Sequence, residues 1–86
     1  MPMSQIENTL FEFIKRNTLT DTTKIKPETL IFREGIFDSM GFILLIDFIE
    51  ENFNIKTCDT DLIEENFESI SAMAHFISRK KIADVA

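Results

Sequence analysis

The chain has 86 residues and a mass of 10.0 kDa, which suffices for one small domain and excludes a multidomain enzyme. Hydrophobic residues make up 44% of the chain and charged residues 28%, with only two Gly and two Pro, so the composition is that of a folded globule. The formal net charge of -6 argues against a nucleic-acid partner, which would need clustered Lys and Arg.

The first predicted element is a helix that ends near Arg16 or Asn17. Ser4 and Glu7 have the spacing of a capping box, in which each side chain satisfies a backbone N–H at the start of a helix. Apolar side chains then recur at helical spacing and predict one buried stripe, formed by Ile6, Leu10, Phe13 and Ile14.

Residues 18–37 predict a long loop, because their apolar residues follow no regular period and Pro27 interrupts any helix. Loops of this length in small domains are usually functional. Gly35 marks a turn near its end. Five apolar side chains should pin the loop to the helices: Leu30, Ile31, Phe32, Ile36 and Phe37.

Residues 40–53 predict a second helix, with Asp38 and Ser39 at its N-terminus. One face is expected in the core and carries Phe42, Leu45, Ile46, Ile49 and Phe53. The opposite face mixes apolar and acidic residues, namely Met40, Ile43, Leu44, Asp47 and Glu51. Apolar residues there need a partner, which is either another element of the fold or another protein.

The sequence predicts two further helices. A short one spans 62–66, with Asp61 and Glu64 at cap spacing. Ser69 opens the last helix, 70–79, whose core stripe is Ile70, Met73, Ala74 and Ile77. Three basic residues, Arg79, Lys80 and Lys81, would suit the negative end of that helix. Residues 83–86 are expected to fray.

Together these elements predict an all-α fold, a small four-helix bundle with three longer helices and a short third one. The whole chain, 1–86, is expected to be one domain, ordered over about 4–80. Its charge is uneven, because residues 38–68 carry nine acidic side chains against the single base Lys56. This segment either attracts basic partner surfaces or is simply a solvated face.

The sequence gives little support for a metal site or for a catalytic nucleophile. Cys58 and His75 are each the only residue of their type, so no intrachain disulfide and no zinc pattern is possible. A calcium loop would need Gly where this chain has Glu64, and adjacent pairs such as Glu50 and Glu51 suit a solvated surface. No apolar run is long enough for a membrane span and the start does not look like a signal peptide, so we expect a cytoplasmic protein.

The segments 35–40 (Gly-Ile-Phe-Asp-Ser-Met) and 49–55 (Ile-Glu-Glu-Asn-Phe-Asn-Ile) resemble the acyl carrier protein family, which includes peptidyl and aminoacyl carriers. The family signature is Gly, about two residues, Asp-Ser-Leu (or Met or Ile), then a helix ending in Glu-Glu-x-Phe-x-Ile. The likeness covers most of the chain, and the family fold is a four-helix bundle.

The resemblance implies that Ser39 accepts 4′-phosphopantetheine from coenzyme A and that acyl or aminoacyl groups travel on it as thioesters. Asp38 would support that attachment, and the chain itself would not be an enzyme. The implied partners are a phosphopantetheinyl transferase, a loading ligase, and a downstream acyltransferase or synthase in lipid or natural-product biosynthesis. They would dock on Met40, Ile43, Leu44, Asp47 and Glu51, and the carrier is expected to be a monomer without metal, nucleic acid or membrane span.

One departure from the family bears on the partners. Carriers of fatty acid synthesis usually have acidic residues soon after the Ser, whereas this chain has Gly41, Phe42, Ile43 and Leu44. We therefore expect a specialised, stand-alone carrier served by a dedicated adenylating ligase or acyltransferase. Two other readings stay open: an unmodified helical adaptor that binds through Met40, Ile43 and Leu44, and a small hydrolase that pairs Ser39 with His75.

Overall fold

The computed structural model describes the backbone of residues 3–18 and 22–85, and the side chains of residues 5–18 and 23–81. The described chain is all-helical and has no strand. Its helices are α1 (Met3–Asn17), α2 (Ser39–Phe53), α3 (Glu64–Phe67) and α4 (Ile70–Val85), with short 3-10 segments η1 (Thr22–Lys24) and η2 (Asp59–Asp61). The predicted four-helix bundle with a short third helix is thereby confirmed.

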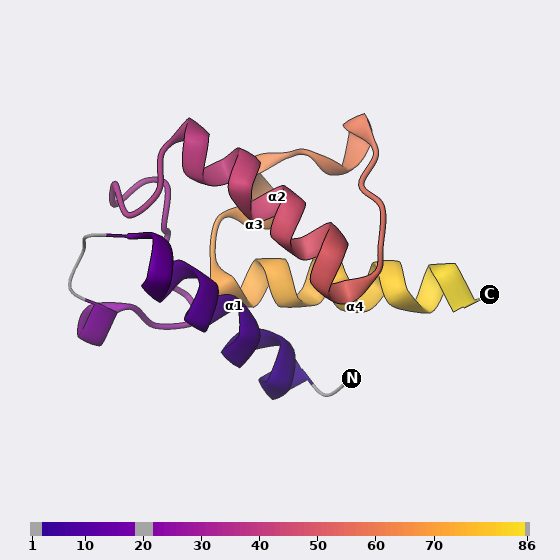
Figure 1. Ribbon diagram of the computed structural model, residues 1–86, viewed down its shortest axis with the longest axis horizontal. Coiled ribbons are helices and arrows are strands. Elements are labelled where there is room, and N and C mark those ends of the chain that lie inside the picture. Colours follow the sequence, from indigo (N-terminus) through magenta and orange to yellow (C-terminus); the bar gives the residue numbers. More distant parts are fainter. Residues whose placement is uncertain (1–2, 19–21, 86) are drawn as a thin grey trace.

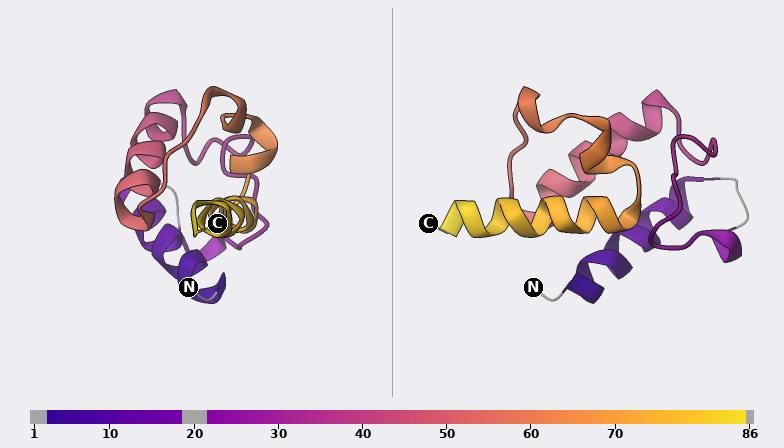
Figure 2. Two further views of the ribbon diagram at one scale, coloured as in Figure 1. Left: turned by 90° about the vertical axis from the view of Figure 1, so that its right-hand side faces the viewer. Right: turned by 180° about the vertical axis from the view of Figure 1, so that it is seen from behind.

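The last helix, α4, is the common support of the bundle. Each of α1, α2 and α3 contacts it. Figure 1 shows α1 crossing α4, with α2 on the upper side of the molecule. In the reverse view of Figure 2, α3 lies over the first half of α4, and the connection from α2 rises beside it. The start of α2 therefore lies close to the long loop, away from the chain termini.

The apolar stripe of α1 forms part of the core as predicted. Ile6, Leu10 and Ile14 are buried and Phe13 is half-buried against them. The helix ends at Asn17, where the sequence predicts its end. It begins at Met3, so Ser4 lies inside the helix and not at the cap position that the predicted capping box requires.

The long loop is pinned to the bundle by apolar side chains and by backbone hydrogen bonds. Of the five residues predicted to anchor it, three are buried (Ile31, Ile36 and Phe37) and two are half-buried (Leu30 and Phe32); Ile25 is a further buried anchor. The Ile31 N–H donates to the Glu68 carbonyl at 3.0 Å. Gly35 has a φ of 73°, which confirms the turn predicted there.

The start of the short helix differs from the prediction. The helix α3 begins at Glu64 after the cap residue Ile63, and Asp61 belongs to the preceding segment η2. The carboxylate of Asp61 accepts hydrogen bonds from the Cys58 N–H and the Lys80 ammonium, so it is not the cap of α3.

The last helix begins as predicted but continues further. The Ser69 hydroxyl accepts from the Ala72 N–H at 3.1 Å, and the predicted stripe of Ile70, Met73, Ala74 and Ile77 is buried. The helix extends past Arg79 to Val85, so residues 83–85 are helical, and residue 86 lies outside the described residues. The three basic residues are therefore not in the last turn, and each contacts an earlier segment instead.

Among the described residues, no helix combines the length and apolar character needed to cross a bilayer.

Candidate functional site around Ser39

The first turn of α2 is fixed by Asp38. This residue is the N-cap, with extended backbone, and its Oδ1 accepts a hydrogen bond from the Gly41 N–H at 3.0 Å. The Asp38 carbonyl accepts from the Phe42 N–H at 2.9 Å. Of the two residues predicted at this N-terminus, Asp38 makes the cap and Ser39 is the first helical residue, with its side chain exposed.

This position gives the Ser39 hydroxyl a distinct electrostatic setting. The first N–H groups of a helix have no intrahelical acceptor, and the helix dipole places a partial positive charge there. A negative group attached to Ser39 would be stabilised by both. An exposed hydroxyl can also be reached by a modifying enzyme.

The structure reveals a role for Gly41 that the sequence analysis did not identify. A Cβ placed on Gly41 would lie 2.9 Å from Cγ and 3.2 Å from Cβ of Phe37, a buried side chain. The absence of a side chain thus lets the first turn of α2 approach the end of the long loop. A Gly inside a helix lowers stability by about 1 kcal/mol relative to Ala, so its presence in a predicted helix indicates a position where packing leaves no room for a side chain.

An apolar groove of about 280 Å³ lies beside Ser39. It is lined by residues of the long loop, α2, and the segment leading into α3: Phe32, Ser39, Phe42, Leu62, Ile63, Glu64 and Phe67. Phe42 contacts Phe32 and Phe67 edge to face, with ring centroids 5.6 and 5.5 Å apart. These ring contacts join the loop, α2 and α3 into one wall around the groove.

A second hollow, of about 410 Å³, lies on another side of α2. Its lining includes Met40 and Leu44 from α2 and Gly35 and Phe37 from the loop. Helix geometry separates Met40 and Leu44 widely from Ser39 and Phe42 around the α2 axis. The first turns of α2 are thus flanked by two depressions, and Ser39 lines only the first of them.

The mixed face of α2 is not covered by any element of the described chain. Met40, Ile43 and Leu44 are 65%, 56% and 48% exposed, and Asp47 and Glu51 are also exposed. On the predicted core face, Leu45, Ile49 and Phe53 are buried, whereas Phe42 and Ile46 are half-buried against the core. Of the two partners that the sequence allowed for the mixed face, another element of the fold is ruled out for the described residues.

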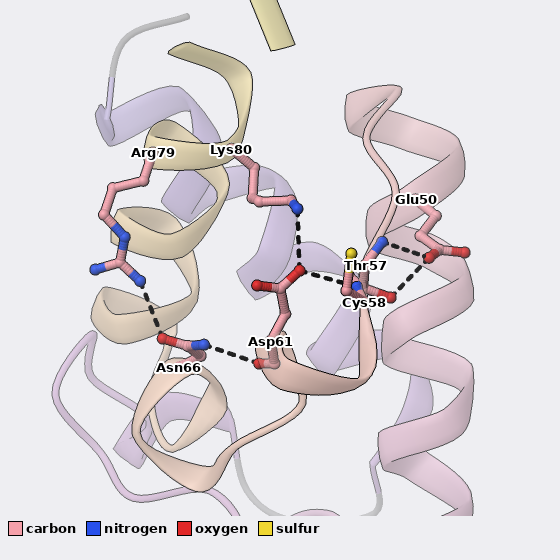
Figure 3. Close-up of polar contacts among 7 residues, drawn as sticks. All are labelled: Glu50, Thr57, Cys58, Asp61, Asn66, Arg79 and Lys80. Atoms are coloured by element: carbon pink, nitrogen blue, oxygen red, sulfur yellow. Dashed lines mark hydrogen bonds and ion pairs between the residues drawn. The ribbon is translucent and has the colours of Figure 1, made fainter. Parts of the chain in front are cut away.

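Two carboxylates hold the connection between α2 and α3 (Figure 3). Oε2 of Glu50 accepts from the backbone N–H and the hydroxyl of Thr57, at 2.9 and 2.7 Å. These bonds lower the pKa of Glu50, the backbone bond most. The pKa of Asp61 is lowered first by the hydrogen bond from the Cys58 N–H and then by the Lys80 ammonium.

The other candidate chemistries gain no geometric support. His75 is exposed on α4 and does not line the groove that contains Ser39, so the described residues do not assemble a Ser–His pair there. Cys58 is a free, exposed thiol. Within the described part of the chain, no three His, Cys, Asp or Glu side chains gather as a metal site would require.

Comparison with protein-family models and with curated proteins found no match for this chain.

Proposed function

We propose that this protein is an acyl carrier that bears 4′-phosphopantetheine on Ser39. One observation carries the proposal: Ser39 is an exposed residue at the start of α2, directly after its cap Asp38, within the first of the two segments that resemble the carrier family. The four-helix bundle agrees with the fold that this resemblance implies. The chain would act as a carrier and not as an enzyme.

The residues around Ser39 suit the group. The exposed hydroxyl can become a phosphodiester, whose negative charge is favoured by the N-terminal N–H groups of α2. Asp38 keeps the first turn in place through its bond to Gly41, which fixes the backbone position of Ser39. The apolar groove next to Ser39 offers a surface along which an attached arm can lie.

The group supplies a terminal thiol that holds the acyl or aminoacyl cargo as a thioester. The chain's own residues do the rest: they anchor the arm at one hydroxyl, orient it and offer a surface to partners. We place the docking surface on Met40, Ile43, Leu44, Asp47 and Glu51. These are the exposed residues of α2 that follow Ser39 along its mixed face.

The composition of this surface supports a particular kind of partner. Its centre is apolar and two carboxylates lie further along the helix, so the matching surface would have an apolar centre and a few basic residues. This supports a specialised, stand-alone carrier served by a phosphopantetheinyl transferase and a dedicated adenylating ligase or acyltransferase.

The test is the intact mass of the protein before and after incubation with coenzyme A, Mg²⁺ and a broad-specificity phosphopantetheinyl transferase. We expect the wild type to gain the mass of one phosphopantetheine. Ser39→Ala should gain none, and Ser78→Ala, which alters a serine on α4, should behave as the wild type. A folded wild-type protein that gains no mass would contradict the proposal.

The exposed apolar residues also favour a second candidate, an unmodified helical adaptor. Such an adaptor would bind its partner through Met40, Ile43 and Leu44 and would not need the Ser39 hydroxyl. The two candidates differ in one variant: Ser39→Ala abolishes the activity of a carrier and leaves that of an adaptor intact.

A further inference from the structure

Three consecutive basic residues of α4 each bind a different part of the segment 53–66, which runs from the end of α2 into α3. Arg79 Nη2 donates to Asn66 Oδ1 at 3.0 Å, and Lys80 Nζ to Asp61 Oδ2 at 3.0 Å (Figure 3). Lys81 Nζ donates to the Phe53 carbonyl at 2.8 Å. The three acceptors lie at the end of α2, in η2 and in α3, so α4 holds this segment at its beginning, middle and end.

Asp61 connects these contacts to the groove. Its Oδ2 accepts from the Cys58 N–H as well as from Lys80, and its backbone carbonyl accepts from the Ile63 N–H at 2.9 Å and the Asn66 side-chain amide at 2.8 Å. The next two residues, Leu62 and Ile63, line the groove beside Ser39. The position of Asp61 therefore determines where these two groove residues lie.

Apolar burial does not hold this segment. Ile55 and Phe67 are buried, but no residue from 56 to 66 is, and Leu62 and Ile63 are 39% and 46% exposed. A segment without buried apolar side chains depends on its polar contacts for a fixed position. Two of these contacts come from α4, to Asp61 and Asn66, and the others come from Glu50 of α2 and Arg33 of the loop.

The central ion pair is shielded enough to hold the segment. The side chains of Lys80 and Asp61 are each 22% exposed, and their atoms are 3.0 Å apart. By contrast, the pair between Arg33 and Glu64 is 3.5 Å apart, and its side chains are 70% and 58% exposed. Solvent and salt weaken an exposed pair much more than a partly buried one.

We propose that Arg79, Lys80 and Lys81 form a clamp that positions Leu62 and Ile63 and so sets the shape of the groove beside Ser39. The clamp acts through Asn66, Asp61 and the Phe53 carbonyl, and its three members are positioning residues. The importance of the groove for a group attached to Ser39 rests on the proposed function. The clamp itself does not.

The test uses the full, unmodified chain with ¹³C-labelled Ile and Leu methyl groups. Leu62 and Ile63 line the same groove as Phe32, Phe42 and Phe67, so ring currents should displace their methyl resonances. Lys80→Met keeps most of the side-chain length but removes the ammonium. We expect it to move the Leu62 and Ile63 methyl shifts towards unstructured values and to speed amide exchange at Ile63 and Asn66 at least tenfold.

Two matched variants separate positioning from general stability. Lys80→Arg keeps the charge and should retain the wild-type methyl shifts, and Lys15→Met removes an exposed lysine of α1 and should change neither readout. Amide exchange in α1 should stay the same in every variant. Unchanged methyl shifts in Lys80→Met would overturn the clamp, and so would an increase in exchange that is uniform over the chain.

The mass measurement on the same samples tells the two proposals apart. If the wild type gains no phosphopantetheine while Lys80→Met moves the methyl shifts, the proposed function fails and the clamp stands. If the wild type gains the group and Lys80→Met leaves the shifts unchanged, the clamp fails and the proposed function stands.

Discussion

Replacement of Gly41 by Ala in the first turn of α2 should stabilise the protein less than a Gly-to-Ala replacement does at an ordinary helical position. Ala is favoured over Gly inside a helix by about 1 kcal/mol. At Gly41, however, the new Cβ would lie 2.9 Å from Cγ of Phe37, which is the base of a buried side chain and cannot easily move away. Overpacking of this kind costs typically about 1–3 kcal/mol.

The matched comparison is an exposed position in the middle of the same helix, Asp47. There, Asp47→Ala should be more stable than Asp47→Gly by about 1 kcal/mol, which measures helix propensity alone. The Gly-to-Ala change at position 41 should fall short of this gain by about 1–3 kcal/mol, the cost of the contact with Phe37. The difference between the two positions isolates the packing term.

Urea unfolding followed by circular dichroism at 222 nm measures each free energy of unfolding. With a slope of about 1 kcal/mol per M for a small domain, the expected difference displaces the midpoint by about 1 M or more. An equal gain from Gly to Ala at positions 41 and 47 would refute the argument. The first turn of α2 would then have room for a side chain, and its close approach to the loop would not be a constraint.

Further predictions concern the cap, the attachment residue, acid stability and the docking face. Asp38→Ala should lower the free energy of unfolding by about 0.5–2 kcal/mol, and Asp38→Asn much less because its amide oxygen can still accept from Gly41; urea unfolding measures both. Ser39→Ala should change the unfolding free energy by less than about 0.5 kcal/mol, since Asp38 makes the cap, and a loss comparable to that of Asp38→Ala would contradict this assignment. Folding lowers the pKa of Glu50 and Asp61, so their contribution to stability is complete above the unfolded pKa values and is lost as the pH falls through the folded ones. Thermal melts should show the stability of the wild type decreasing from about pH 5 downward. The decrease should be less steep in the double variant Glu50→Gln, Asp61→Asn. In initial-rate assays, Ile43→Ser should reduce kcat/KM of the phosphopantetheinyl transferase about tenfold, and Asp47→Asn should reduce it less. A larger effect of Asp47→Asn would mean that the transferase recognises this surface mainly by its charge.

The parts of the fold that the sequence predicts are those set by local periodicity and capping. The stripe of Ile6, Leu10 and Ile14 repeats at helical spacing and is buried, and Asp38 and Ser69 cap the helices that follow them. In each case the signal lies within one or two helical turns of the chain. No knowledge of distant contacts is needed to interpret it.

The start of α3 shows where such local signals fail. Asp61 and Glu64 have cap spacing, but the Asp61 carboxylate binds Lys80, a residue 19 positions later in the chain. Its Oδ2 also accepts from the Cys58 N–H at the start of η2, so the carboxylate is used in these two contacts and does not cap α3. The extension of α4 beyond Arg79 has a similar cause. Arg79 and Lys81 donate to Asn66 of α3 and to the Phe53 carbonyl at the end of α2, instead of lying at the C-terminal end of α4.

The candidate site was predictable in its centre and not in its surroundings. The sequence predicts the exposed Ser39 at a helix start and identifies the mixed face of Met40, Ile43 and Leu44, but it leaves open whether another element covers that face. The groove beside Ser39 joins Phe32 of the loop to Leu62 near α3, segments far apart in the sequence. Only the packing of the bundle brings them together.

The two sides of Ser39 are therefore held by different forces. On one side, the first turn of α2 is fixed by the Asp38 cap and by contact of Gly41 with the buried Phe37. On the other, Leu62 and Ile63 belong to a segment that lacks buried residues and depends on hydrogen bonds and an ion pair. Salt weakens the ion pair on the second side far more than the packing of Gly41 against Phe37 on the first. Added salt should consequently loosen the groove and leave the packing at the start of α2 unchanged, whereas Gly41→Ala alters the start of α2 and Lys80→Met alters only the groove next to it.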